Sequence, residues 1–381
     1  MKKLLCTVSL ILVALFSLSA CASQNQAAAP QNTEATPTPT VTASGVETPA
    51  AETPTPAVEK GKYVLKFGYG EPADLKTSLE HVAATAFKEY IERESKGEIA
   101  VELYPGGTLG DSEALIQQVQ LGSIQGCPTA DAKLATLFAP IQILSIPFLF
   151  DNRDVAFEVL DGDLGQKLKD QVLETTKLRI LSIGENGGFR CFTNNTREIK
   201  TPADLKGLKF RVMTSQVMMD MVKNLGGIPV SITFNEMYTS IQTNVIQGEE
   251  NPPSVIRAFS LNEVQPYLTL DRHTYSVSFF VLNNGWFNAL PENLQKIVLD
   301  GGQAAQKASR ETSTTWDSQS VADLKARGMQ VYEPTPDEIA LFREATQQPA
   351  IDYLLNNIDK TWVDEIQADV AAARTKLGLA K

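Results

Sequence analysis

After Lys62 the sequence alternates between short apolar strands and amphipathic helices, and this alternation restricts the fold more than any other feature. Residues 64–67 and 99–103 have the pattern of strands, and each is followed by a glycine-containing turn. Apolar residues recur at helical spacing over residues 75–91, and a second helix is expected over residues 111–122. This succession favours a parallel sheet with helices on its faces.

The same succession starts again further along the chain. A strand is expected over residues 178–183, and Thr201-Pro202 is typical of a helix start with proline at the first helical position. The later predicted elements are a strand over 208–213, a helix over 217–225, a strand over 228–232 and a helix over 235–247. The sequence therefore predicts two α/β units in one chain.

A helical pattern runs over residues 291–328 and is interrupted only by Gly301-Gly302. At 1.5 Å per residue such a helix would be about 57 Å long, which exceeds one small domain. We therefore expect it to lie along both units. Thr335 and Glu338 then form a capping box that opens a further helix, and a last amphipathic segment follows.

The N-terminal part has the features of an export signal and a tether. Residues 1–20 contain two lysines, an uncharged apolar stretch and small residues, as in a secretory signal peptide. Leu18-Ser19-Ala20-Cys21 resembles the bacterial lipobox, in which the cysteine receives a diacylglycerol; a plain signal peptide with a chance cysteine is the alternative. Residues 21–61 are rich in proline and threonine and contain no aromatic residue, so we interpret them as a lipid anchor followed by a disordered linker. The expected location is extracytoplasmic, lipid-anchored to the outer face of the cell membrane or periplasmic.

Charge and composition exclude several classes of function. The chain has 34 basic and 45 acidic residues, whereas a nucleic-acid partner would need a surplus of Lys and Arg. His81 and His273 are the only histidines, which excludes a histidine-rich zinc site. No phosphate loop or nucleophile elbow is present, so we expect no cofactor and no metal. Cys127 and Cys191 either form a disulfide or remain two independent thiols.

Two arginines are the main candidates for ligand binding. Arg190 follows two glycines and is flanked by aromatic residues, and Arg211 lies in an expected strand whose apolar residues occupy the opposite face. At the carboxyl end of such a strand a side chain would point into the crevice where open α/β sheets bind ligands, and a guanidinium fork suits a carboxylate. For either arginine alone, a surface or inter-strand ion pair is the alternative. Asn251 is either part of a turn or a further hydrogen-bond donor to that carboxylate.

At these residues the chain resembles the solute-binding proteins of tripartite ATP-independent periplasmic (TRAP) transporters, the DctP family. The resemblance covers about residues 63–355 and rests on four motifs in order. These are Tyr104-Pro105 with Leu109-Gly110, Thr201-Pro202-Ala203-Asp204-Leu205-Lys206-Gly207-Leu208-Lys209-Phe210-Arg211-Val212, Glu236-Met237-Tyr238 and Gly248-Glu249-Glu250-Asn251-Pro252. It implies an α/β, two-lobe, periplasmic-binding-protein-like fold with crossing strands and a long shared helix. Lobe 1 would comprise residues 62–186 and about 276–315, and lobe 2 residues 187–275 and about 316–381.

The resemblance also implies roles for particular residues. Arg211 would form a salt bridge with the ligand carboxylate, Arg190 would be the second cation of the site, and Asn251 would donate a hydrogen bond to the same carboxylate. The other residues implied are Phe234 against the ligand body, Thr214 beside Arg211 and, from the first lobe, Glu71 and the strand end at residues 127–130.

The resemblance implies a binding protein that captures a small organic acid and delivers it to a TRAP membrane permease. Sialic-acid binders tend to carry asparagine where this chain has Gly70 and glutamate near Ala130, so sialic acid is disfavoured. A sugar acid is expected if Glu71 and Glu185 line the cleft, and a C4-dicarboxylate is expected if they face solvent.

Two other functions stay open at this point. A ligand sensor that presents its closed form to a signalling receptor would use the same pocket. An enzyme of carboxylate metabolism would need a base or nucleophile beside Arg211, and the sequence places none there.

Overall fold

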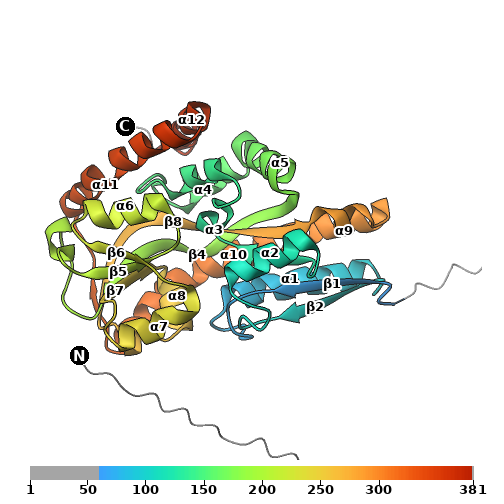
Figure 1. Ribbon diagram of the computed structural model, residues 1–381, viewed down its shortest axis with the longest axis horizontal. Helices are drawn as coiled ribbons and strands as arrows, with labels where there is room; N and C mark the ends of the chain where they lie inside the picture. Colours follow the sequence, from blue (N-terminus) through green and yellow to red (C-terminus); the bar gives the residue numbers. More distant parts are fainter. Residues whose placement is uncertain (1–59, 380–381) are drawn as a thin grey trace, which may run out of the picture. The chain divides into compact units, whose positions relative to one another are not determined.

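The computed structural model describes residues 60–379 of the chain (Figure 1). The predicted signal peptide, Cys21 and nearly all of the predicted linker therefore lie outside the described residues. Within residues 60–379, no helix is long and apolar enough to cross a membrane.

A mixed nine-stranded sheet organises the described part of the chain. In spatial order its strands are β2 (Ile99–Tyr104), β1 (Tyr63–Gly68), β3 (Gly126–Thr129), β8 (Tyr267–Asn283), β4 (Leu178–Asn194), β7 (Gly248–Asn251), β5 (Lys209–Val212) and β6 (Ile228–Ser231), with β9 (Gln330–Tyr332) beside β8. The strands β1, β2 and β3 form a first parallel group, and β5, β6 and β7 form a second. The two α/β units predicted from the sequence correspond to these two groups.

The long strands β4 and β8 join the two groups. They pair with each other in antiparallel fashion along most of their 17 residues, and β3 pairs with β8 while β7 pairs with β4. The sequence predicted only residues 178–183 of β4, because a bulge between Glu185 and Gly188 breaks the alternation. Gly187 and Gly188 have φ angles of 86° and 85°, which residues with a side chain rarely adopt. Residues 248–251, interpreted from sequence alone as a turn, form β7.

Helices cover the sheet. They are α1 (Leu79–Glu94), α2 (Ser112–Leu121), α3 (Asp131–Leu134), α4 (Arg153–Leu160), α5 (Asp163–Thr176), α6 (Gln216–Asn224), α7 (Phe234–Gln242), α8 (Pro253–Ala258), α9 (Asn284–Asn288), α10 (Glu292–Ala326), α11 (Pro336–Asn357) and α12 (Lys360–Lys376), with 3-10 turns η1 (Ala139–Ser145), η2 (Pro202–Leu205) and η3 (Leu261–Glu263). The Asp111 side chain caps α2, and Thr335 with Glu338 caps α11 as the sequence predicts. The helix predicted over residues 235–247 is shorter, because α7 ends at Gln242.

The C-terminal helices pack on different parts of the fold. Helix α11 contacts α6, whereas α12 contacts α4, α5 and η1. Trp362, Val363 and Ile366 of α12 belong to the same buried cluster as Leu164 and Leu168 of α5. The sequence-based lobe boundaries stay a prediction, and α12 packs on elements that this prediction gives to lobe 1.

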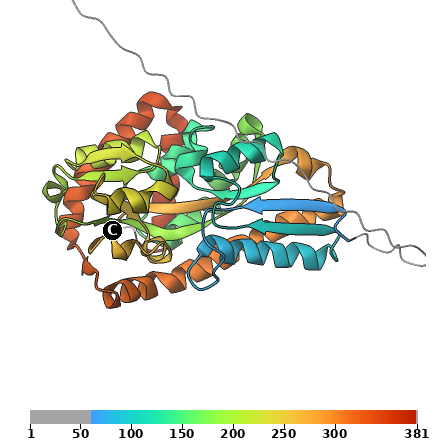
Figure 2. The ribbon, with the colours of Figure 1, turned by 60° about the horizontal axis from the view of Figure 1, so that its bottom comes forward.

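The long helix predicted from the sequence is confirmed as α10, which contacts α1 beside the first strand group and α8 beside the second (Figure 2). Gly301 and Gly302 do not break it. A Cβ atom at Gly302 would lie 2.6 Å from Leu181 Cβ, and one at Gly301 would lie 2.8 Å from Ile91 Cγ1. The two glycines therefore allow α10 to approach β4 and α1 closely.

Cys127 and Cys191 are free and buried. This agrees with the alternative of two independent thiols rather than a disulfide.

We predict that Gly302→Ala destabilises the protein, although alanine is the better helix former by about 1 kcal/mol. The added methyl group meets the Cβ atom of Leu181, which cannot move without its strand. Overpacking of this kind costs about 1 to 3 kcal/mol. Urea unfolding measures the change, with the exposed Lys307→Ala on the same helix as control, expected within about 0.5 kcal/mol of wild type. A Gly302→Ala variant more stable than wild type would contradict the close approach.

Candidate functional site

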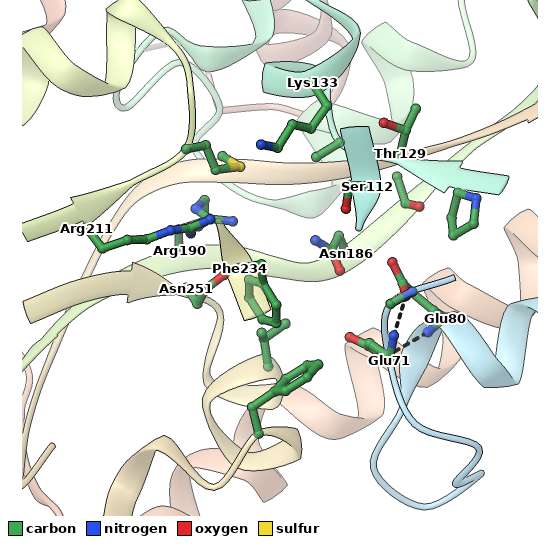
Figure 3. A pocket seen from close by; sticks show the side chains of 17 residues that line it. Glu71, Glu80, Ser112, Thr129, Lys133, Asn186, Arg190, Arg211, Phe234 and Asn251 are labelled. Carbon is green, nitrogen blue, oxygen red and sulfur yellow. Dashed lines mark hydrogen bonds between the residues drawn. The ribbon is translucent and has the colours of Figure 1, made fainter. Parts of the chain in front are cut away.

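A cavity lies where the two strand groups and the crossing strands meet (Figure 3). The space between its lining residues is about 680 Å³, part of which is open to solvent. Its lining residues are Gly70, Glu71, Glu80, Ser112, Pro128, Thr129, Ala130, Lys133, Asn186, Arg190, Arg211, Met213, Phe234, Asn251, Val255, Phe259 and Ser278.

Arg211 is a buried cation without an acidic partner. Its neighbours Phe210 and Val212 in β5 are packed in a hydrophobic cluster, so the alternation of the strand directs Arg211 to the other face. Its Nε donates to the carbonyl of Ile232 at 3.0 Å, and the guanidinium lies 5.6 Å from the ring centre of Phe234. Arg211 is only 2% exposed. Even so, no carboxylate among the described residues forms a salt bridge with its guanidinium.

Burial lowers the pKa of Arg211 to about 10, with Glu250 partly opposing this effect. The guanidinium is still charged at neutral pH, and its two terminal nitrogens have no hydrogen-bond acceptor among the described residues. The guanidinium of Arg211 can therefore donate two parallel hydrogen bonds from a positively charged group to a ligand in the cavity.

Arg190 differs from Arg211 because its charge is already compensated. Its guanidinium forms a two-point ion pair with Glu250, including Nη2 to Oε1 at 2.9 Å. His273 lies 3.2 Å from the same carboxylate and 2.6 Å from Asp271. Burial alone would raise the pKa of Glu250, but Arg190 and His273 outweigh it and lower the pKa to about 2. The inter-strand ion pair that the sequence left open is thus present, and Arg190 also lines the cavity.

His273 completes this buried network. Burial alone would lower its pKa, but Asp271 and Glu250 raise it to about 9, so His273 is charged at neutral pH. Arg190 and His273 together balance Glu250 and Asp271, which leaves no net charge from these four groups to attract a ligand.

Asn251 lies at the end of β7, beside the arginines. Its amide donates to Glu249, whose carboxylate also accepts from the Thr193 hydroxyl. Burial raises the pKa of Glu249 to about 7. Asn251 is therefore held in place by its neighbours while it lines the cavity.

Two glutamates lie on the opposite side of the cavity from the arginines (Figure 3). Glu71 Oε2 accepts from the Ser78 hydroxyl at 2.9 Å and from the backbone N–H of Glu80 at 3.0 Å. Glu80 Oε2 accepts from the backbone N–H groups of Gly70 at 3.0 Å and Glu71 at 2.9 Å. Burial raises the pKa of both carboxyls, and Glu71 contributes to raising that of Glu80 to about 8.

Other polar groups line the space between these two sides. Lys133 lines the cavity and pairs with Glu113 of α2. The hydroxyl of Thr129 is buried without a protein partner. Within the part of the chain that the structure describes, no cluster of His, Cys, Asp and Glu side chains is arranged to hold a metal ion.

Five of the six residues that the sequence singled out for ligand binding line this cavity, namely Arg190, Arg211, Asn251, Phe234 and Glu71. Thr214 does not, because it is exposed after the end of β5 and its hydroxyl pairs with that of Ser231 at 3.0 Å. Glu185 is also outside the lining, because it is buried against Arg153 at 2.8 Å.

Glu80, Lys133 and Asn186 also line the cavity and were not predicted from the sequence. Glu80 lies in the first turn of α1, where an acidic residue normally complements the helix N-terminus and needs no further explanation. No signal in the sequence distinguishes it from such a residue. The strand end at residues 127–130 was included, and it carries Thr129.

Comparison with known proteins identifies the family. Residues 73–354 match the model of the DctP family, described as bacterial extracellular solute-binding protein, family 7. The chain is 34% identical over 268 residues to the 2,3-diketo-L-gulonate-binding periplasmic protein YiaO of Escherichia coli. This alignment covers 70% of this chain and 80% of that protein.

Two solved structures are similar in fold. The sugar acid binding protein DctPAm from Advenella mimigardefordensis, in complex with galactonate, has a TM-score of 0.79 and 32% identity over 83% of this chain and 100% of its own. A TRAP periplasmic solute binding protein from Polaromonas sp. JS666, bound to D-erythronate, has a TM-score of 0.76 and 32% identity over 80% of this chain and 98% of its own. The chain therefore belongs to the DctP family of TRAP solute-binding proteins.

Proposed function

We propose that this protein binds a sugar acid, with the carboxylate on Arg211 and the hydroxyl groups towards Glu71 and Glu80, and delivers it to a TRAP membrane permease. The family consists of binding proteins rather than enzymes, so the cleft captures its ligand without chemistry. The observation that carries the proposal is a buried, unpaired guanidinium facing two carboxyl groups across one cavity.

The unpaired charge of Arg211 supports an anionic ligand. A carboxylate would meet the two terminal nitrogens of the guanidinium, which have no protein acceptor. Arg190 would contribute to the cavity wall more than to its net charge, since Glu250 already compensates the charge of Arg190. Asn251 and Phe234 flank the same end and would contact the carboxylate and the carbon chain.

The polar character of the opposite end supports a hydroxylated ligand. Carboxyl groups accept hydrogen bonds from hydroxyls, and Glu71 lines the cavity as the sugar-acid alternative requires. Glu185 does not line the cavity, so the support for a hydroxylated ligand comes from Glu71 and from Glu80, which also lines it. The relatives named for 2,3-diketo-L-gulonate, galactonate and D-erythronate bind ligands of this class. A C4-dicarboxylate is the alternative, and it would place a second carboxylate near these glutamates.

A membrane tether would keep the protein close to the permease to which it delivers its ligand. We propose that a diacylglycerol on Cys21 and the linker that follows provide this tether. A ligand sensor that feeds a signalling receptor is the remaining alternative, and a permease gene beside this one would favour transport.

We predict that aldonates and uronates stabilise the protein in a thermal-shift screen and bind at micromolar strength by calorimetry. A ligand that binds only the native state stabilises it by RT ln(1 + [L]/Kd). Galactose, which has the carbon chain of galactonate but no carboxylate, is the matched control and should give no shift. A screen in which only malate, succinate or aromatic acids bind would contradict the sugar-acid proposal.

We predict that Arg211→Ala weakens sugar-acid binding by about 30-fold to several thousandfold, because the ligand carboxylate loses its buried partner. Arg211→Lys should also weaken binding, since one ammonium group cannot replace a two-point fork. Calorimetry measures both, with the exposed Arg327→Ala as control. Binding of the Arg211→Ala variant within about threefold of wild type would place the carboxylate elsewhere.

We predict that mature protein purified from membranes begins at Cys21 and carries a diacylglycerol. Mass spectrometry of the intact N-terminus decides this, and Cys21→Ser should release the protein from the membrane fraction. A mature N-terminus after Cys21, or a cysteine without lipid, would remove the tether.

A further inference from the structure

We propose that Glu80 is a specificity-determining residue of this cleft. Together with Glu71 it accepts hydrogen bonds from hydroxyl groups at the far end of the ligand and disfavours a second carboxylate there. This inference rests on the proposed sugar-acid function and extends it, because it separates monocarboxylic sugar acids from dicarboxylic ones.

The position of Glu80 is fixed by the backbone. Its Oε2 accepts from the N–H groups of Gly70 and Glu71, which hold the carboxyl group at the cavity wall opposite Arg211 (Figure 3). No donor among the described residues reaches its Oε1. One oxygen is therefore used by the fold, and the other is available to a ligand.

No cation compensates this end of the cavity. Three basic side chains line the cavity: Arg211 lies across from the glutamates, Arg190 pairs with Glu250, and Lys133 pairs with Glu113. A ligand carboxylate bound to Arg211 gains an unpaired cation. Above pH 8, where Glu80 is ionised, a second carboxylate beside it would meet a like charge that no cation offsets, which is unfavourable in a partly enclosed site.

A purely structural role for Glu80 can be separated from this one. The two backbone N–H groups need an acceptor oxygen but no charge, and the amide oxygen of glutamine provides it. Glu80→Gln therefore keeps the turn at residues 70–71 and removes only the carboxylate. Glu71→Gln is a second variant of the same kind, because Ser78 and the Glu80 backbone can donate to an amide oxygen equally well.

The experiment compares galactonate with galactarate, which has the same carbon chain but a carboxylate at both ends. Calorimetry at pH 8.5 gives the ratio of the two dissociation constants for each protein. Wild type should bind galactonate at least about 30-fold more tightly than galactarate. In Glu80→Gln the ratio should fall by about tenfold or more, and Glu71→Gln should change it in the same direction. The exposed Glu89→Gln, on the same helix, should leave the ratio unchanged.

The ratio should also depend on pH. Because burial and Glu71 raise the pKa of Glu80 to about 8, the pair of carboxyls gains negative charge as the pH rises from 6.5 to 8.5. Burial raises the pKa of Tyr69 and Cys127 above their ordinary values, so neither gains negative charge in this range, and burial lowers the pKa of His81. Discrimination against galactarate should therefore grow about threefold or more in wild type, and not in Glu80→Gln.

The outcomes separate the two proposals. If wild type binds galactonate and galactarate equally well, or if Glu80→Gln leaves the ratio unchanged, this inference is wrong while the sugar-acid function stands. If no aldonate or uronate binds wild type, the proposed function is wrong and the inference falls with it; if another sugar acid binds in place of galactonate, the same ratio is measured with that acid and its dicarboxylic counterpart. Thermal melting of each variant without ligand shows that the fold is intact.

Discussion

The antiparallel pairing of β4 and β8 is the contact on which the rest of the structure depends. These strands connect the two parallel groups, and each group extends the sheet from one of them. The cavity lies on this junction: β4 supplies Asn186 and Arg190, β8 supplies Ser278, and the flanking groups supply Arg211 and the glutamates. A site assembled in this way exists only when both strand groups have folded onto the central pair.

The electrostatics of the cavity follow from which charges the fold compensates. Arg190, Glu250, His273 and Asp271 form a balanced buried network, so their charges maintain the structure and have little effect at long range. Arg211 remains as a separate cation on one side. In the proposed binding mode, this charge pattern would orient the ligand with its anionic end at β5 and its neutral end at α1.

The sequence predicted the alternating elements, the caps of α2 and α11, the long helix α10 and the basic end of the site, because each depends on local periodicity or on one side chain in a strand. It missed most of β4, because a glycine bulge interrupts the pattern. It left open an inter-strand ion pair for Arg190 but did not identify Glu250 as the partner, because this depends on strand pairing between residues distant in sequence. Glu80 was not predicted as a site residue, because an acidic residue in the first turn of a helix is common without any role in binding. The extent of β4, the partner of Arg190 and the role of Glu80 all depend on strand pairing and burial, which the residue types alone do not reveal.

The burial of Arg211 without a partner also affects how the empty protein behaves. A buried guanidinium without an acidic partner attracts small anions as well as ligand carboxylates, so chloride, acetate or phosphate in the medium can enter the cleft. Such ions compete with the ligand for the same donors. The apparent affinity measured for a ligand would then depend on the anions in the buffer as well as on the ligand itself.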